Sequence, residues 1–173
     1  MSREELFARV EDSLRVAGQR PPTLDPEVAE AIRSSSTMMA YSLDGVARTD
    51  ATPTFEVFKV RGAERRLSTR FSRILADGLQ ACDYLRPLVE RPVAFNFQSV
   101  GIRCEARRET TDVILDFTHC CAVVRGGNGR LQVAAFDRGS RNLIRLARRT
   151  FPDDESLREG CDVCERWLGA GRP

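Results

Sequence analysis

Residues 63–89 decide the fold, and they read AERRLSTRFSRILADGLQACDYLRPLV. Apolar residues recur in this stretch at intervals of three, four and seven, which places them along one stripe of a helix. Gly78 lies inside the stretch, where a glycine allows a bend or a close approach of the helix to a sheet. The pattern predicts one long amphipathic helix whose stripe faces a core. The stripe consists of Leu67, Phe71, Ile74, Leu75, Cys82, Leu85 and Leu88.

The residues that follow alternate between apolar and polar, as strands with one buried face do. A Gly-Gly-Asn-Gly sequence at 126–129 separates two apolar runs and predicts a β-hairpin turn. Gly101 marks a candidate bulge. The expected strands cover 93–98, 102–104, 113–117, 120–124 and 131–136, with two earlier ones near 38–43 and 54–60 that are joined by a loop over 47–53.

Helices are expected at both ends of the chain. Two N-terminal helices, over 1–17 and 25–33, are separated by a break at Gly18–Pro22, and Asp25 followed by Pro26 is a typical helix start. Ser140 is expected to cap a helix over 140–149, and Asp153 or Asp154 to begin the last one. The 173 residues fit a single domain overall. We expect it to consist of an N-terminal helical arm, 1–36, and an α+β domain, 37–173.

This order of elements predicts an α+β fold. A mainly antiparallel sheet of about five strands would pack against the long central helix, with the N- and C-terminal helices around them. The order is similar to that of profilin-like, roadblock and longin-type domains, and the resemblance is carried by element order and no motif. It implies a dimeric scaffold that contacts GTPases or motor complexes.

Composition excludes several classes of protein. The net charge of +2 and the isoelectric point of about 8.3 are lower than a dedicated nucleic-acid-binding domain usually has. No apolar run approaches a membrane span, and the first residues lack the pattern of a secretory signal, so a cytoplasmic protein with reduced thiols is expected. Lys59 is the only lysine among 27 basic residues. We attribute this arginine bias to a GC-rich genome. The alternative is a viral or injected effector protein in the cytoplasm or nucleus of a host cell.

Cys161 and Cys164 form a CxxC pair, which is the most suggestive short motif of the chain. Zinc would need two further ligands, and His119 with Cys121, on one face of an alternating strand, would complete the set. Both cysteines of the pair also fall on the apolar stripe of the last predicted helix. We therefore favour core packing of the thiols, with a zinc-stabilised domain as an alternative.

Arginines gather over 138–149, where they would share one face of a helix. A solvated helix face is the usual meaning of such a pattern. Binding of an acidic protein surface and binding of nucleic acid are the functional alternatives. The residues concerned are Arg138, Arg141, Arg145, Arg148 and Arg149.

The function expected from these patterns is a non-catalytic interaction or regulatory module. The chain has one histidine, no paired-carboxylate motif and no cofactor fingerprint, which leaves little for acid–base catalysis. We therefore expect no enzyme activity and no cofactor. The predicted partner is a protein, and surplus apolar stripes on the helices over 1–17 and 25–33 predict a homodimer.

Overall fold

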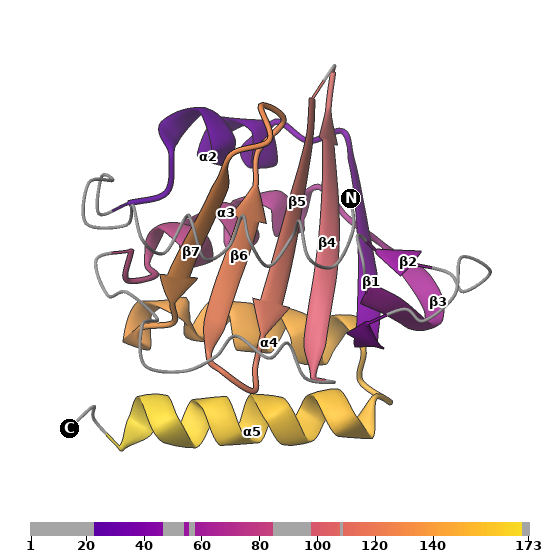
Figure 1. The fold of residues 1–173 in the computed structure, drawn as a ribbon, viewed down its shortest axis with the longest axis vertical. Coiled ribbons are helices and arrows are strands. Elements are labelled where there is room, and N and C mark those ends of the chain that lie inside the picture. Colours follow the sequence, from indigo (N-terminus) through magenta and orange to yellow (C-terminus); the bar gives the residue numbers. More distant parts are fainter. Residues whose placement is uncertain (1–22, 47–53, 56–57, 85–97, 108, 171–173) are drawn as a thin grey trace.

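The computed structural model describes residues 23–46, 54–55, 58–84, 98–107 and 109–170. These ranges contain four α-helices, seven β-strands and a short 3₁₀ helix (Figure 1). The helices are α2 (Pro26–Arg33), α3 (Arg70–Gln80), α4 (Arg141–Thr150) and α5 (Glu155–Gly169), and η2 (Arg138–Ser140) precedes α4. The strands are β1 (Thr37–Val46), β2 (Thr54–Phe55), β3 (Phe58–Leu67), β4 (Ser99–Ala106), β5 (Glu109–Asp116), β6 (Cys121–Arg125) and β7 (Leu131–Ala135).

The described strands form one antiparallel sheet in the order β2-β3-β1-β4-β5-β6-β7. The α+β class and the antiparallel sheet are thus confirmed, while the predicted number of about five strands is too low. The hairpin around 126–129 joins β6 to β7 as predicted. Gly101 is not a bulge, because β4 pairs with β1 and β5 in continuous register through it.

The long central helix predicted over 63–89 is wrong. Residues up to Leu67 belong to β3, which pairs with β1 through Met38 and Leu67. The helix begins at Arg70, after Thr69, and ends at Gln80; it is shorter than α5. Asp83 then forms an antiparallel bridge to Ala135 of β7. The stripe pattern was misleading because Leu67 and Leu75 are buried in the same core. Leu67 reaches it from strand β3, and Leu75 reaches it from helix α3.

One core lies between the sheet and the helices. Figure 1 shows α2, α3 and α4 on the far face of the sheet and α5 along its lower end. Gly78 allows α3 and α4 to approach closely, since a Cβ there would lie 2.6 Å from Cδ2 of Leu143. The close approach expected at this glycine is therefore between two helices and not between helix and sheet. The core includes Leu75 and Leu79 of α3, Leu143 and Ile144 of α4, and Leu157, Cys161 and Cys164 of α5.

The helix ends agree with local sequence signals. The Asp25 carboxylate accepts a hydrogen bond from the backbone N–H of Glu27, and Asp154 does the same for Leu157, at 2.9 Å in both cases. Ser140 is the N-cap of α4, although its hydroxyl bonds to Asp137 instead of to the helix. The starts at Asp25 and Ser140 are those predicted, and the structure selects Asp154 from the predicted pair of Asp153 and Asp154.

The apolar stripe of α2 is used within the chain. Val28, Ala29 and Ile32 are buried in the core, and the helix contacts α3, β4 and β5. This helix therefore offers no surplus apolar stripe for a second copy. The predicted helix over 1–17, the hinge at 18–22, the loop over 47–53 and nearly all of the strand over 93–98 lie outside the described residues.

The face of the sheet that points away from the helices carries an ion network. Asp112 of β5, only 3% exposed, accepts from Nε of Arg103 at 2.8 Å and from Nη2 of Arg125 at 2.7 Å. The three residues stand opposite one another on β4, β5 and β6. Their side chains therefore tie three neighbouring strands together. Within the described ranges, no helix is both long and apolar enough to cross a membrane.

Candidate functional site

Some arginines of the predicted patch over 138–149 form contacts within the protein. Arg148 of α4 donates from Nη1 to Glu165 of α5 at 2.8 Å, and its Nη2 pairs with Asp162. Nε of Arg141 is buried. Arg145 and Arg149 are exposed. Arg138 lies just before α4, in η2. The structure therefore ties one arginine of the predicted face to α5 and leaves two of them at the surface of α4.

The predicted zinc ligands are not brought together as a set. His119 lies with Nδ1 2.7 Å from Oδ2 of Asp116, and Cys164 lies beside Cys120. Cys120 has a φ of +51° at the end of the turn before β6, so strand alternation does not apply to residues 119–120. In the described part of the chain, no three His, Cys, Asp or Glu side chains form a group that could hold a metal.

All six cysteines are buried free thiols, as the core-packing interpretation expected. Burial raises the pKa of Cys82, Cys104 and Cys161 to about 12. The hydrogen bond with Cys120 and burial raise the pKa of Cys164, and burial with the nearby Asp116 raises that of Cys121. The five thiols with raised pKa therefore stay protonated near neutral pH, whereas nucleophilic chemistry or metal binding would need a thiolate.

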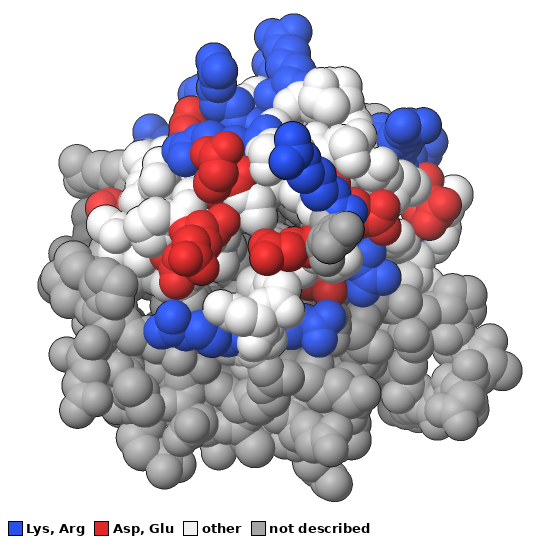
Figure 2. All heavy atoms as spheres, turned by 90° about the horizontal axis from the view of Figure 1, so that it is seen from above, with Lys and Arg blue, Asp and Glu red and all other residues white. Residues whose placement is uncertain are grey.

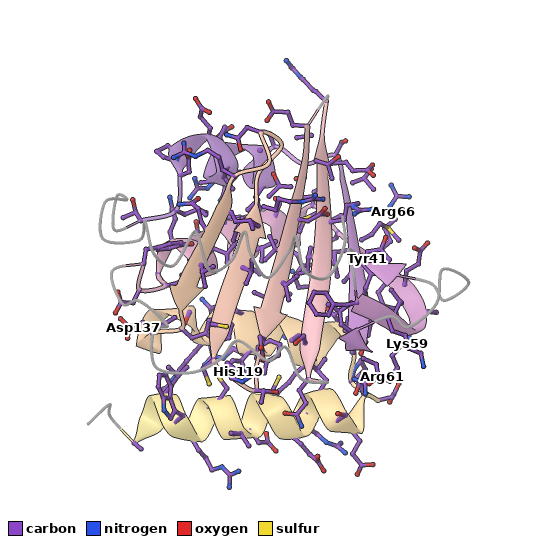
Figure 3. All side chains as sticks on the ribbon, viewed as in Figure 1. Tyr41, Lys59, Arg61, Arg66, His119 and Asp137 are labelled. Atoms are coloured by element: carbon purple, nitrogen blue, oxygen red, sulfur yellow. The ribbon has the colours of Figure 1, made fainter. Side chains whose placement is uncertain are left out.

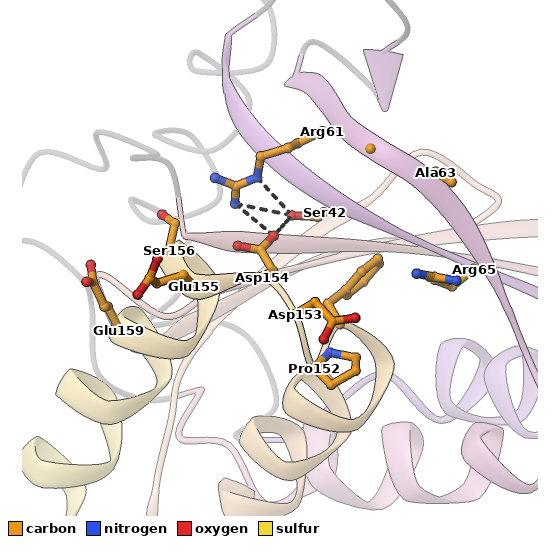
Figure 4. Close-up of a pocket in the computed structure, with 12 residues that line it drawn as sticks. Ser42, Arg61, Ala63, Arg65, Pro152, Asp153, Asp154, Glu155, Ser156 and Glu159 are labelled. Atoms are coloured by element: carbon orange, nitrogen blue, oxygen red, sulfur yellow. Dashed lines mark hydrogen bonds and ion pairs between the residues drawn. The ribbon is translucent and has the colours of Figure 1, made fainter.

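A cleft of about 610 Å³ lies between β3 and the connection from α4 to α5 (Figure 4). Three side chains meet at its wall. Nη2 of Arg61 is 3.1 Å from Oδ2 of Asp154, and it donates to Oγ of Ser42 at 3.2 Å. Ser42 in turn donates to Asp154. Asp154 also caps α5, so this cluster fixes the start of α5 against β1 and β3.

The cleft carries charges of both signs. Asp153, Glu155 and Glu159 line it from the α5 side, and Arg65 lines it from β3. The paired Arg61 and Asp154 neutralise one another. Most of the residues that line the cleft are polar or charged, which suits contact with a hydrated polypeptide better than enclosure of an apolar ligand.

Strand β3 has an exposed outer edge beside this cleft. Residues 62–66 are all exposed, so neither face of this part of the strand is covered. Among the described residues, β3 has partners on its outer side only at Phe58 and Lys59, which pair with β2. The backbone groups of residues 62–66 on that side therefore have no strand partner in the described chain, which makes them a template for an added strand.

This side of the sheet is basic. Figure 3 places Lys59, Arg61 and Arg66 along this side of the sheet, next to Tyr41 of β1. Arg65 and Arg66 are exposed, with one acidic neighbour, Glu64. We use the term "β3 edge" for residues 62–66 from here on.

Sequence reasoning missed the β3 edge because it assigned Arg65 and Arg66 to the polar side of a helix. A local signal was present. Ser68 and Thr69 are residues that typically precede a helix, and they lie inside the stretch interpreted as continuous helix. Gly62, which has a φ of +72°, marks an irregular strand where the register with β1 shifts between Ala40 and Ser42.

Comparison with known proteins gives no match: neither a protein-family model, nor a curated protein, nor a solved structure resembles this chain closely enough to be informative.

Proposed function

We propose that this chain is a non-catalytic protein-binding module that binds an extended acidic segment of a partner protein at the β3 edge. The observation that carries the proposal is the run of exposed residues 62–66, the part of β3 that has no outer strand partner in the described chain. An extended peptide adds to such an edge by main-chain hydrogen bonds, and its side chains give the specificity.

The charges of the edge select the partner. Arg65 and Arg66 are exposed neighbours on β3, so they project to opposite faces of the sheet. An added strand with acidic residues on both faces would place carboxylates near each guanidinium. Opposite charges across neighbouring strands stabilise the pairing, and like charges oppose it. Two copies of the β3 edge would bring arginines together, so this edge does not favour pairing with itself.

The experiment uses the full chain and a fluorescent peptide of alternating Glu and Thr. We expect binding, and we expect the double variant Arg65→Glu with Arg66→Glu to weaken it by about tenfold or more, because like charges then face one another. The matched control is Arg145→Glu with Arg149→Glu, which makes the same charge change on α4 and is expected to leave the affinity unchanged.

A second peptide tests whether strand addition is the mode of binding. The same sequence with N-methyl groups at alternate residues cannot donate main-chain hydrogen bonds along one edge, so its binding is expected to be lost. Equal binding of the methylated peptide would overturn the proposal. Loss of binding in the α4 control variant would also overturn it, and duplex DNA that binds through Arg145 and Arg149 would favour the nucleic-acid alternative.

Self-association is a separate part of this proposal. Its support is the apolar stripe of Leu6, Phe7, Val10 and Leu14 in the sequence, outside the described residues. We expect a homodimer, and a mass measured by sedimentation at micromolar concentration checks it. A mass equal to one chain would contradict the homodimer and leave the β3 proposal standing, because the two rest on different residues.

A further inference from the structure

A second surface lies at the opposite end of the sheet from α5. A groove of about 1320 Å³ runs between α2 and the turn that joins β4 to β5. Glu27, Glu30 and Ser34 line it from the helix, and Arg107 and Glu109 line it from the strands. Figure 2, which looks down on this end of the molecule, shows acidic side chains gathered in the middle of the face with basic ones around them.

The groove is negatively charged. Its three glutamates are exposed, and Arg107 is the one basic residue among the described residues that line it. An acidic surface of this kind attracts cations but does not by itself identify a ligand. A more specific feature lies beside it.

A small recess of about 50 Å³ adjoins the groove. The two share Glu27, Ala31 and Glu109, and the recess adds Thr111 of β5 and Asn128 of the β6–β7 turn. Its volume exceeds the roughly 10–15 Å³ that one water molecule needs. The recess therefore has room for the head group of a side chain that enters from the groove.

Thr111 is the polar group that points to a ligand. The residue is 1% exposed, and in the described part of the chain its hydroxyl oxygen has no hydrogen-bond partner. A buried hydroxyl without a partner is unfavourable and rare in native proteins, so each instance needs an explanation. Asn128 lines the same recess but is not bonded to Thr111; its Oδ1 accepts from the backbone N–H of Arg130 at 2.9 Å.

We propose that the groove binds a basic segment of a partner protein, and that a lysine ammonium of this segment enters the recess between Glu27 and Glu109 and donates to Thr111 Oγ1. An ammonium has three donors, and the recess offers two carboxylates and one hydroxyl. It is also more compact than a guanidinium. The groove is far larger than the recess, so it leaves space for the peptide that carries the lysine. This site uses none of the residues of the β3 edge.

The test titrates the full chain with a fluorescent lysine–glycine peptide and compares arginine–glycine and glutamate–glycine peptides of the same length. We expect the lysine peptide to bind most tightly. The double variant Glu27→Gln with Glu109→Gln is expected to weaken binding by about tenfold or more, and Thr111→Val by about threefold to tenfold. The matched control, Glu155→Gln with Glu159→Gln, makes the same change at two exposed glutamates of α5, away from the groove, and is expected to leave the affinity unchanged.

The stability of Thr111→Val separates a binding effect from a folding defect. Valine has nearly the shape of threonine and lacks the buried hydroxyl, so the Tm of the free protein is expected to stay the same or to rise by about 2–4 °C. Unchanged affinity in Thr111→Val would overturn the proposal, because the recess would then not be used. Equal weakening in the control, or tighter binding of the arginine peptide, would overturn it as well.

The two binding proposals can be tested independently of one another. The variant Arg65→Glu with Arg66→Glu is expected to bind the lysine peptide normally, and Thr111→Val is expected to bind the acidic peptide normally. If either variant lost binding of both the lysine peptide and the acidic peptide, the assignment of two independent sites would be contradicted.

Discussion

Replacing Asp116 by alanine is expected to lower the free energy of unfolding by about 3 kcal/mol or more, because hydrogen bonds to a buried charged acceptor contribute about 1.5–3 kcal/mol each. The Asp116 side chain is fully buried at the end of β5. Its Oδ1 accepts from the backbone N–H of Thr118 at 2.9 Å and of His119 at 3.2 Å. Its Oδ2 lies 2.7 Å from Nδ1 of His119. The carboxylate thus holds the turn between β5 and β6. Urea denaturation measures the loss.

The control for this prediction is His119→Ala, which removes one of the three partners and keeps the two backbone hydrogen bonds. We expect a loss of about 1.5 kcal/mol, the lower end of the range for one hydrogen bond to a charged acceptor, because the His119 ring is partly exposed. The variant Asp116→Asn should lie between the two, since an amide oxygen still accepts from the turn. Equal losses in Asp116→Ala and His119→Ala would mean that the backbone hydrogen bonds contribute nothing.

The second large effect is unfolding at alkaline pH. Burial raises the pKa of Cys82, Cys104 and Cys161 from 9.0 to about 12. Above pH 9 the unfolded chain loses these protons while the folded chain keeps them, so stability is fully present below pH 9 and falls between pH 9 and 12. One complete shift of this size corresponds to about 4 kcal/mol, and typical domains have about 5–15 kcal/mol in total. We therefore expect the chain to unfold before pH 12, as measured by circular dichroism.

The variant Cys161→Ala tests the cause of alkaline unfolding. It removes one buried thiol, so the pH midpoint of unfolding is expected to move upward, even though stability at pH 7 falls because the side chain leaves a small cavity. If the pH midpoint of unfolding and the stability at pH 7 both fell, groups other than Cys161 would control unfolding at alkaline pH.

Short-range features of this fold could be predicted from the sequence. Asp25 before Pro26, Ser140, and the pair Asp153 and Asp154 each mark a helix start, and a capping residue acts on backbone groups only two or three positions away. The hairpin at 126–129 and the burial of Cys161 and Cys164 on a helical stripe follow from equally local patterns. The α+β class follows from the order of such elements.

The stretch that decided the predicted fold was misassigned for a long-range reason. Residues 63–67 carry side chains compatible with a helix, but pairing with β1 holds them in β3. Such pairing depends on a strand more than twenty positions earlier in the chain, which periodicity within the stretch does not reveal. The same pairing creates the β3 edge and exposes Arg65 and Arg66 on it.

The sequence by itself determined where α2, α4 and α5 begin, which residues turn the last hairpin, and that Cys161 and Cys164 lie on the apolar stripe of the last helix. These are properties of neighbouring residues and of apolar spacing. Tertiary structure alone decided that Arg148 is held by α5, that β3 lies near the margin of the sheet, and that Thr111 is buried beneath α2 beside Glu27 and Glu109. Each of these depends on which distant segments meet, because the hydrogen bonds and burial involved join residues that no local pattern connects.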